Sequence, residues 1–175
     1  MKKVLVTGGA GYIGSHTVVS LKDKGFYPVI VDDLRSSSSF ILEGLSTMLK
    51  DGYAFHCEDV CNVDSMTKIF REHRFDAVIH FAAYKSVGES CEEPLKYYQN
   101  NLQGLTNILR LCEEFGVPKF VFSSSCTVYG EPEEKQCMLT KRCLNRIANS
   151  SGEYVSFCTQ NIASSKSTFN SEGIK

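Results

Sequence analysis

The sequence contains no tryptophan, only four prolines in 175 residues and no long run of apolar residues. A hydrophobic content of 42% with so few prolines excludes collagen-like and low-complexity chains and indicates a globular protein about one domain long. No stretch approaches the roughly 20 apolar residues of a membrane span. The start, Met1-Lys2-Lys3, is followed by only three apolar residues before Thr7, too few for a signal peptide. We therefore expect a cytoplasmic protein with no membrane partner.

An excess of charge of either sign is also missing, because 19 basic and 20 acidic side chains leave a net charge of −1. This balance excludes the basic surface expected of a protein with a nucleic-acid partner. None of the eight cysteines occurs in a C-x-x-C pair, so we expect reduced thiols rather than disulfides. His56, Cys57 and Cys61 lie close in sequence, yet no second cluster supplies a fourth zinc ligand, and we predict no metal site.

Short β-rich runs alternate with longer helical patterns in the first 123 residues, an order typical of βαβ units. Apolar triplets such as Val4-Leu5-Val6 indicate strands that are buried on both faces. We expect strands at residues 3–7, 28–32, 53–57, 77–81 and 119–123, and helices at residues 12–24, 40–50, 63–74 and 94–115, with Asn62 as an N-cap and Pro94 in a first turn. The predicted fold class is α/β, a truncated, Rossmann-like, doubly wound parallel sheet.

The character of the chain changes after residue 134. Residues 1–134 carry thirteen basic and eighteen acidic side chains, whereas residues 135–175 carry six and two, so the net charge changes from −5 to +4. The second part also holds seven serines between residues 150 and 171. We expect a folded domain over residues 1–134 and a divergent, serine-rich tail over residues 135–175, partly disordered, with a helix at 138–148 and a strand at 154–158.

The predicted helix at 94–115 is apolar on two sides. One face carries Ile108, Leu111 and Phe115, and the other is a stripe of residues spaced three and four apart: Leu95, Tyr98, Leu102, Leu105, Leu109 and Cys112. The sheet covers only one of these faces. Either the helix is deeply buried within the chain or it forms the seam of a homodimer, and the sequence favours neither.

A glycine-rich turn follows the first predicted strand and opens the first helix. Gly8, Gly11 and Gly14 stand where a tight turn, close approach to a pyrophosphate and close helix packing require them. Asp32 ends the second strand eighteen residues after Gly14, where a carboxylate accepts hydrogen bonds from an adenosine ribose. This context favours a dinucleotide site over a plain glycine turn. An acidic residue there favours NAD over NADP, a preference moderated by Arg35 and the serines at 36–39.

Three further loops follow predicted strands at the same edge of the sheet, where ligands bind in open α/β sheets. They cover residues 58–60, 81–90 and 123–130. With the motif at 7–17, the Val87-Gly88-Glu89-Ser90 turn and the Tyr97-Tyr98-Gln99-Asn100-Asn101 run, the first 134 residues resemble the UDP-glucose 4-epimerases of the extended short-chain dehydrogenase/reductase family.

The resemblance implies bound NAD that oxidises C4 of a UDP-hexose and returns the hydride to the opposite face of the 4-keto sugar. The implied cofactor-binding residues are Gly8, Gly11, Tyr12, Ile13, Gly14, Asp32, Asp33, Asp59, Val60, Phe81, Ala82, Ala83, Lys85, Asn100 and Ser123. The implied substrate-binding residues are Lys85, Ser86, Ser125, Cys126 and Thr127, with Ser125 also catalytic, beside the reacting hydroxyl.

One departure from the family concerns the catalytic base. The family completes its site with a tyrosine and a lysine four residues later, and none of the eight tyrosines here has that partner. The sequence therefore predicts either an epimerase of galactose metabolism by descent or a catalytically incomplete NAD-binding fragment. Another nucleotide-sugar epimerase or dehydratase is a further alternative, disfavoured by residues 87–90.

Overall fold

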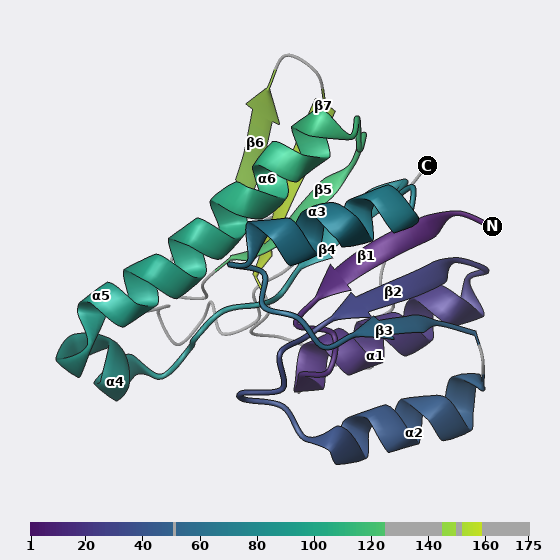
Figure 1. Cartoon of the computed structure of the whole chain (residues 1–175), viewed down its shortest axis with the longest axis horizontal. Coiled ribbons are helices and arrows are strands. Elements are labelled where there is room, and N and C mark those ends of the chain that lie inside the picture. Colours follow the sequence, from purple (N-terminus) through teal and green to yellow (C-terminus); the bar gives the residue numbers. More distant parts are fainter. Residues whose placement is uncertain (51, 125–144, 150–151, 159–175) are drawn as a thin grey trace, which may run out of the picture.

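The computed structural model describes residues 1–50, 52–124, 145–149 and 152–158. Its sheet has the strand order β3-β2-β1-β4-β5-β7-β6, and every neighbouring pair is parallel except β6 and β7 (Figure 1). The strands are β1 (Lys3–Thr7), β2 (Tyr27–Val31), β3 (Ala54–His56), β4 (Ala77–His80), β5 (Phe120–Ser124), β6 (Asn145–Asn149) and β7 (Gly152–Cys158). The predicted parallel α/β sheet is confirmed.

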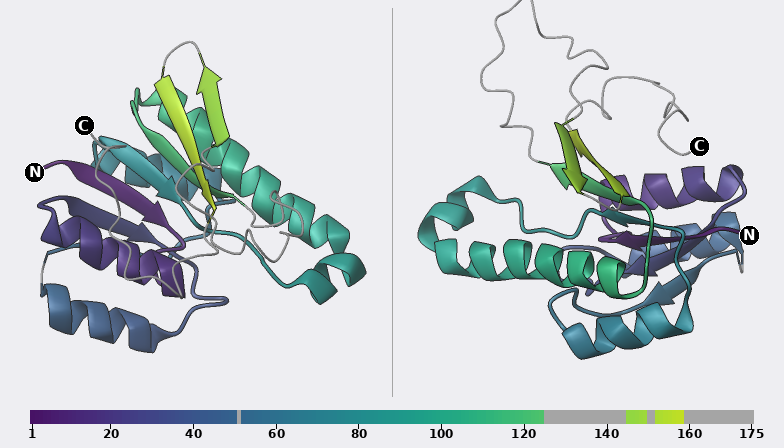
Figure 2. Two further views of the ribbon diagram at one scale, coloured as in Figure 1. Left: turned by 180° about the vertical axis from the view of Figure 1, so that it is seen from behind. Right: turned by 90° about the horizontal axis from the view of Figure 1, so that it is seen from above.

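Helices cover both faces of this sheet, as a doubly wound fold requires (Figure 2). They are α1 (Tyr12–Asp23), α2 (Ser39–Leu49), α3 (Val63–Glu72), α4 (Val87–Glu92), α5 (Pro94–Tyr97), the π-helix η1 (Tyr98–Gln103) and α6 (Gly104–Glu114). Successive strand residues point to opposite faces. Leu5 therefore packs with α3 and α6, and Val4 and Val6 pack with α1 and α2. None of the described helices is long and apolar enough to cross a membrane.

The predicted helix at 94–115 is a rod of three segments, α5, η1 and α6, that extends beyond the sheet towards α4 (Figures 1 and 2). Its carboxyl-terminal half is buried, with Ile108 and Leu111 in the core, whereas Leu95, Tyr98 and Leu102 are exposed. The rod is thus buried at its carboxyl-terminal end and exposed to solvent at its amino-terminal end.

Two residues fix the buried end of the rod against the loop after β3. A Cβ on Gly104 would lie 2.8 Å from Cγ2 of Val60, so only glycine permits this close approach. The buried amide of Asn107 donates from Nδ2 to the carbonyl oxygens of Val60 and Cys61, at 3.2 and 3.1 Å. These contacts hold the loop after β3 to α6.

The second part of the chain corrects one prediction and confirms another. The helix predicted at 138–148 is wrong for residues 145–148, which lie in β6, while residues 138–144 lie outside the described residues. Ile and Asn in this segment are weak helix formers, and antiparallel pairing with β7 satisfies their backbone instead. The predicted strand at 154–158 is confirmed within β7, which pairs with β5. The disorder predicted elsewhere in the tail lies outside the described residues.

His80 is a titratable group in the centre of the sheet. It is 1% exposed, its Nδ1 lies 2.7 Å from the Thr7 hydroxyl oxygen, and its ring stacks on Phe120 and Phe122. Burial lowers the pKa of His80 to about 4. The imidazole of His80 is therefore neutral in the folded chain at neutral pH.

This burial predicts an acid-sensitive fold. Because the pKa of His80 is lower in the folded chain than in the unfolded chain, its neutral form stabilises the fold fully above the unfolded value, and this contribution falls as pH drops towards 4. We expect the free energy of unfolding to fall by about 2 kcal/mol between pH 7 and pH 5 from this residue. Urea unfolding at pH 7 and pH 5 measures this difference, and most of it should be absent in His80→Gln. The difference should persist in the control His16→Gln, since His16 is exposed. An equal difference between the two pH values in both variants would refute the assignment.

Candidate functional site

The turn between β1 and α1 is built on close backbone contacts. Gly8 has a φ of +68°, and a Cβ there would lie 2.7 Å from the backbone nitrogen of Ala82. A Cβ on Gly14 would lie 2.2 Å from the carbonyl oxygen of Gly8. Glycine is therefore required at both positions. Gly8 needs it for its positive φ and for space, and Gly14 needs it for space. The result is a tight turn that brings the amino terminus of α1 beside the loop after β4.

The amino terminus of α1 is not capped by a side chain. Its N-cap is Gly11, and its first turn holds no acidic residue. By contrast, Ser38 caps α2 and Asn62 caps α3 through a side-chain oxygen. The first N–H groups of a helix are orphan donors, and the helix dipole makes that end favourable for an anion. The start of α1 thus has the features of an anion-binding site.

Asp32 follows β2 at the same edge of the sheet. Its Oδ2 accepts a hydrogen bond from the backbone nitrogen of Ala10 at 3.0 Å, and its Oδ1 accepts one from that of Leu34 at 2.9 Å. Two carboxylate oxygens offer about four acceptor positions. Asp32 is thereby fixed beside the glycine turn with acceptor capacity left for a ligand.

These groups line one cavity of about 390 Å³. Most of the predicted cofactor-binding residues surround it, together with Ser86: Gly8, Gly11, Tyr12, Asp32, Asp33, Val60, Phe81, Ala82, Ala83, Lys85 and Asn100. Ile13, Gly14, Asp59 and Ser123 do not line it, and Ser123 lies within β5. Ser125, Cys126 and Thr127 lie outside the described residues. The cavity is of the size that binds small molecules and cofactors.

Arg35 crosses between three loops beside this cavity. Its Nε donates to Oδ2 of Asp33 at 2.6 Å, one terminal nitrogen donates to the Tyr84 hydroxyl at 2.7 Å, and the other donates to Oδ2 of Asp59. Burial acts to lower the pKa of Arg35, but the hydrogen bonds and charges of Asp33 and Asp59 outweigh it and raise that pKa. We call these four residues the Arg35 clamp.

Comparison with protein-family models matches residues 4–154 to the NAD dependent epimerase/dehydratase family. The chain belongs to this family.

Known members resemble the chain over about three quarters of its length. UDP-glucose 4-epimerase 2 of Arabidopsis thaliana is 48% identical over 139 residues, and the UDP-glucose 4-epimerase of Neisseria meningitidis serogroup C is 51% identical over 132. These matches cover 78% and 75% of this chain, but only 40% and 39% of those proteins. The chain thus spans about two fifths of the length of the curated relatives it matches.

A solved structure agrees with these relatives. The UDP-glucose 4-epimerase of Bifidobacterium longum, determined in complex with NAD+ and UDP, superposes with a TM-score of 0.72 at 41% identity. The match covers 76% of this chain and 40% of that one. The Rossmann-like fold is therefore shared with structures of the epimerase/dehydratase family.

Some residues that line the cavity in this epimerase/dehydratase family member were not among the predicted site residues: Val31, Ser36, Ser37, Glu58, Tyr84, Glu89 and Tyr97. Glu89 was detectable as the fourth residue of a Ser-x-x-Glu pattern that begins at Ser86, the N-cap of α4. Tyr97 donates its hydroxyl proton to Glu89 at 2.7 Å and lies across a helix break. No local sequence pattern signals such a contact.

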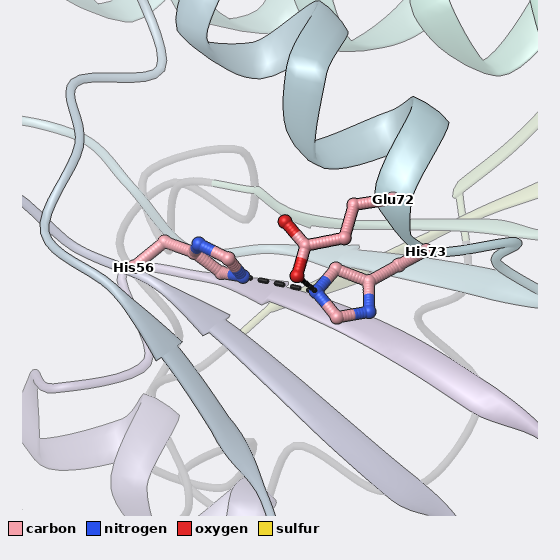
Figure 3. A group of neighbouring side chains, drawn as sticks. All are labelled: His56, Glu72 and His73. Carbon is pink, nitrogen blue, oxygen red and sulfur yellow. Dashed lines mark hydrogen bonds and ion pairs between the residues drawn. The ribbon is translucent and has the colours of Figure 1, made fainter.

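His56, Glu72 and His73 form a second cluster of possible metal ligands, shown in Figure 3. The two Nε2 atoms are 3.0 Å apart, and Oε1 of Glu72 lies 3.6 Å from that of His73. A metal on Nε2 of His73 would leave the proton on Nδ1, which is buried without a hydrogen-bond partner in the described structure. Ligating histidines normally donate that proton. The pair is better explained as a hydrogen bond that joins β3 to the end of α3.

The packing of Gly14 makes a stability prediction. Gly14→Ala should lower the free energy of unfolding by about 3 kcal/mol, because its Cβ overlaps the backbone of the glycine turn. Gly44→Ala is the matched control, since Gly44 lies inside α2 with nothing within 4 Å of its Cβ position, and it should stabilise the chain by about 0.5–1 kcal/mol. Urea unfolding of both variants measures the difference. Similar effects of the two substitutions would contradict the described turn.

Proposed function

We propose that this chain binds NAD in the cavity at the carboxyl edge of its sheet and is the cofactor-binding part of a UDP-glucose 4-epimerase. The observation that carries the proposal is the uncapped amino terminus of α1 beside a turn that only glycine can form. The family match supports it, as does the likeness to the Bifidobacterium longum epimerase, whose structure was determined with NAD+ and UDP bound. We propose that the protein is located in the cytoplasm.

In this proposal, different residues bind different parts of NAD. The backbone N–H of Tyr12, at the start of α1, holds the pyrophosphate. Gly11, whose own N–H donates to the carbonyl oxygen of Gly8 at 3.1 Å, lets the pyrophosphate approach the backbone. Asp32 accepts the hydroxyl protons of the adenosine ribose. Small side chains at Ala82 and Ala83 let the ligand lie against the loop after β4, and Lys85 offers a cation to ribose or phosphate. The other proposed cofactor contacts are Gly8, Asp33, Val60, Phe81 and Asn100, which line the cavity, and Ile13, Gly14, Asp59 and Ser123, which do not line it.

The chemistry that NAD supplies when bound is reversible acceptance of a hydride from C4 of a UDP-hexose. Ser125 is proposed to hydrogen-bond the reacting hydroxyl, with Lys85, Ser86, Cys126 and Thr127 bordering the sugar nucleotide. A base must remove the hydroxyl proton, and the sequence contains no tyrosine followed four residues later by lysine. We therefore propose cofactor binding without turnover for the isolated chain.

Calorimetric titration of NAD+ into the 175-residue chain tests the cofactor site. We expect binding that Asp32→Ala weakens by about tenfold or more, because a charged hydrogen-bond acceptor is lost. Asp23→Ala, an exposed carboxylate at the far end of α1, should leave the affinity unchanged. Circular dichroism melting establishes that each variant is folded. A folded chain that does not bind NAD+ would refute the proposal.

The same preparation tests the catalytic part. Conversion of UDP-galactose to UDP-glucose with added NAD+ should not exceed that of Ser125→Ala. Turnover above this control would show that a residue of the tail replaces the tyrosine base, and the chain would then be an enzyme on its own.

We also propose that the chain forms a homodimer through the α5–η1–α6 rod, where the apolar side chains of Leu95, Tyr98 and Leu102 are exposed. Replacing Leu102 by Lys should shift the chain to the monomer in sedimentation velocity, since a charge would be buried in the seam. Met48→Lys, an exposed apolar residue on α2, is the control and should leave the association state unchanged. A wild-type monomer at all concentrations would contradict the seam.

A further inference from the structure

Arg35 and its partners also bear on which dinucleotide the cavity accepts. An arginine near the end of the second strand is the residue type that accommodates the 2′-phosphate of NADP, whereas an acidic residue favours NAD. This chain has both, since Asp32 and Arg35 are three positions apart. The contacts of Arg35 decide which of the two acts on the ligand.

Each of the three nitrogens of the Arg35 guanidinium has one partner, so three of its five N–H groups are engaged. They donate to Asp33, to Tyr84 and to Asp59, and the guanidinium carbon lies 5.8 Å from the centre of the Tyr84 ring. The backbone nitrogen of Arg35 donates to the second carboxylate oxygen of Asp33 at 3.0 Å. Planar, multiply bonded pairing of this kind fixes the orientation of an arginine more firmly than a single contact.

The charge balance around the clamp is negative. Two carboxylates, Asp33 and Asp59, face one guanidinium, and the carboxylates of Asp32 and Glu58 line the adjacent cavity. A 2′-phosphate brings roughly two further negative charges. It would meet a net negative surface, because the guanidinium that could neutralise it is held between two acids. Lys85 is the lysine that lines the cavity in the described part of the chain.

We propose that Asp33 and Asp59 sequester Arg35 and thereby make the cavity selective for a dinucleotide without a 2′-phosphate. The proposal rests on the proposed NAD binding. The cavity excludes NADP only while both Asp33 and Asp59 bind Arg35. Removal of the two acidic charges frees the guanidinium to bind the 2′-phosphate. Selectivity is then set by three side chains from two loops, and Asp32 alone does not account for it.

Titrations of NADH and NADPH, followed by nucleotide fluorescence anisotropy on the full chain, test this inference. The quantity compared is the ratio of the two dissociation constants. Asp33→Asn/Asp59→Asn keeps the shape of both side chains and removes their charge, and it should reduce the preference for NADH by about tenfold or more. Adding Arg35→Gln to this double variant should return most of the lost preference. Arg35→Gln alone should change the ratio little, because Asp33 and Asp59 already neutralise the charge of the wild-type guanidinium.

The remaining outcomes separate the two proposals. An unchanged ratio in the double variant, or an equal shift with and without Arg35, overturns the sequestration of Arg35; the second result would mean that lost acidic charge alone improves NADPH binding. Wild-type chain that binds NADH and NADPH equally overturns the selectivity proposal and leaves NAD binding standing. Folded wild-type chain that binds neither overturns both. Arg110→Gln, an exposed arginine on α6, is the control for loss of positive charge and should not alter the ratio.

Discussion

The contact between the backbone of Gly8 and that of the loop after β4 sets the geometry of the whole carboxyl edge of the sheet. Phe81 donates its backbone N–H to the carbonyl of Thr7 at 3.0 Å, and no side chain fits between Gly8 and Ala82. The two loops are therefore held at backbone distance. As a result, the start of α1 and the small residues Ala82 and Ala83 after β4 line the same cavity. Asp32 then completes the edge from the neighbouring strand.

The parts of the fold that the sequence predicted are those governed by short-range patterns. The triplet Val4-Leu5-Val6 is buried on both faces, and that requirement is visible in three consecutive residues. Asn62 accepts from the backbone of Ser65, a capping contact that spans only three positions. The glycine turn was equally local. Each of these features depends on residues near one another in the chain, so a pattern could identify it.

The features that the sequence did not predict depend on distant partners. The Arg35 clamp joins residues 24 and 49 positions apart, and nothing near Arg35 indicates that it meets Asp59 and Tyr84. The π-helix η1 interrupts a stripe that reads as continuous helix, because its longer turn changes which side chains face the sheet. Residues 145–149 form a strand because β7 offers a backbone to pair with, a fact of tertiary structure.

The attachment of α6 to the loop after β3 connects two regions that otherwise have separate roles. Gly104 and Asn107 tie the rod to Val60 and Cys61, in the loop that also carries Asp59. In the proposed dimer, a displacement of the rod would therefore be transmitted to the end of the cavity where we propose that the adenosine binds. Thermodynamic linkage makes such an effect reciprocal: the factor by which self-association changes dinucleotide affinity equals the factor by which the dinucleotide changes self-association. Gly104 and Asn107 are thus the contacts through which the proposed association and ligand binding would be coupled.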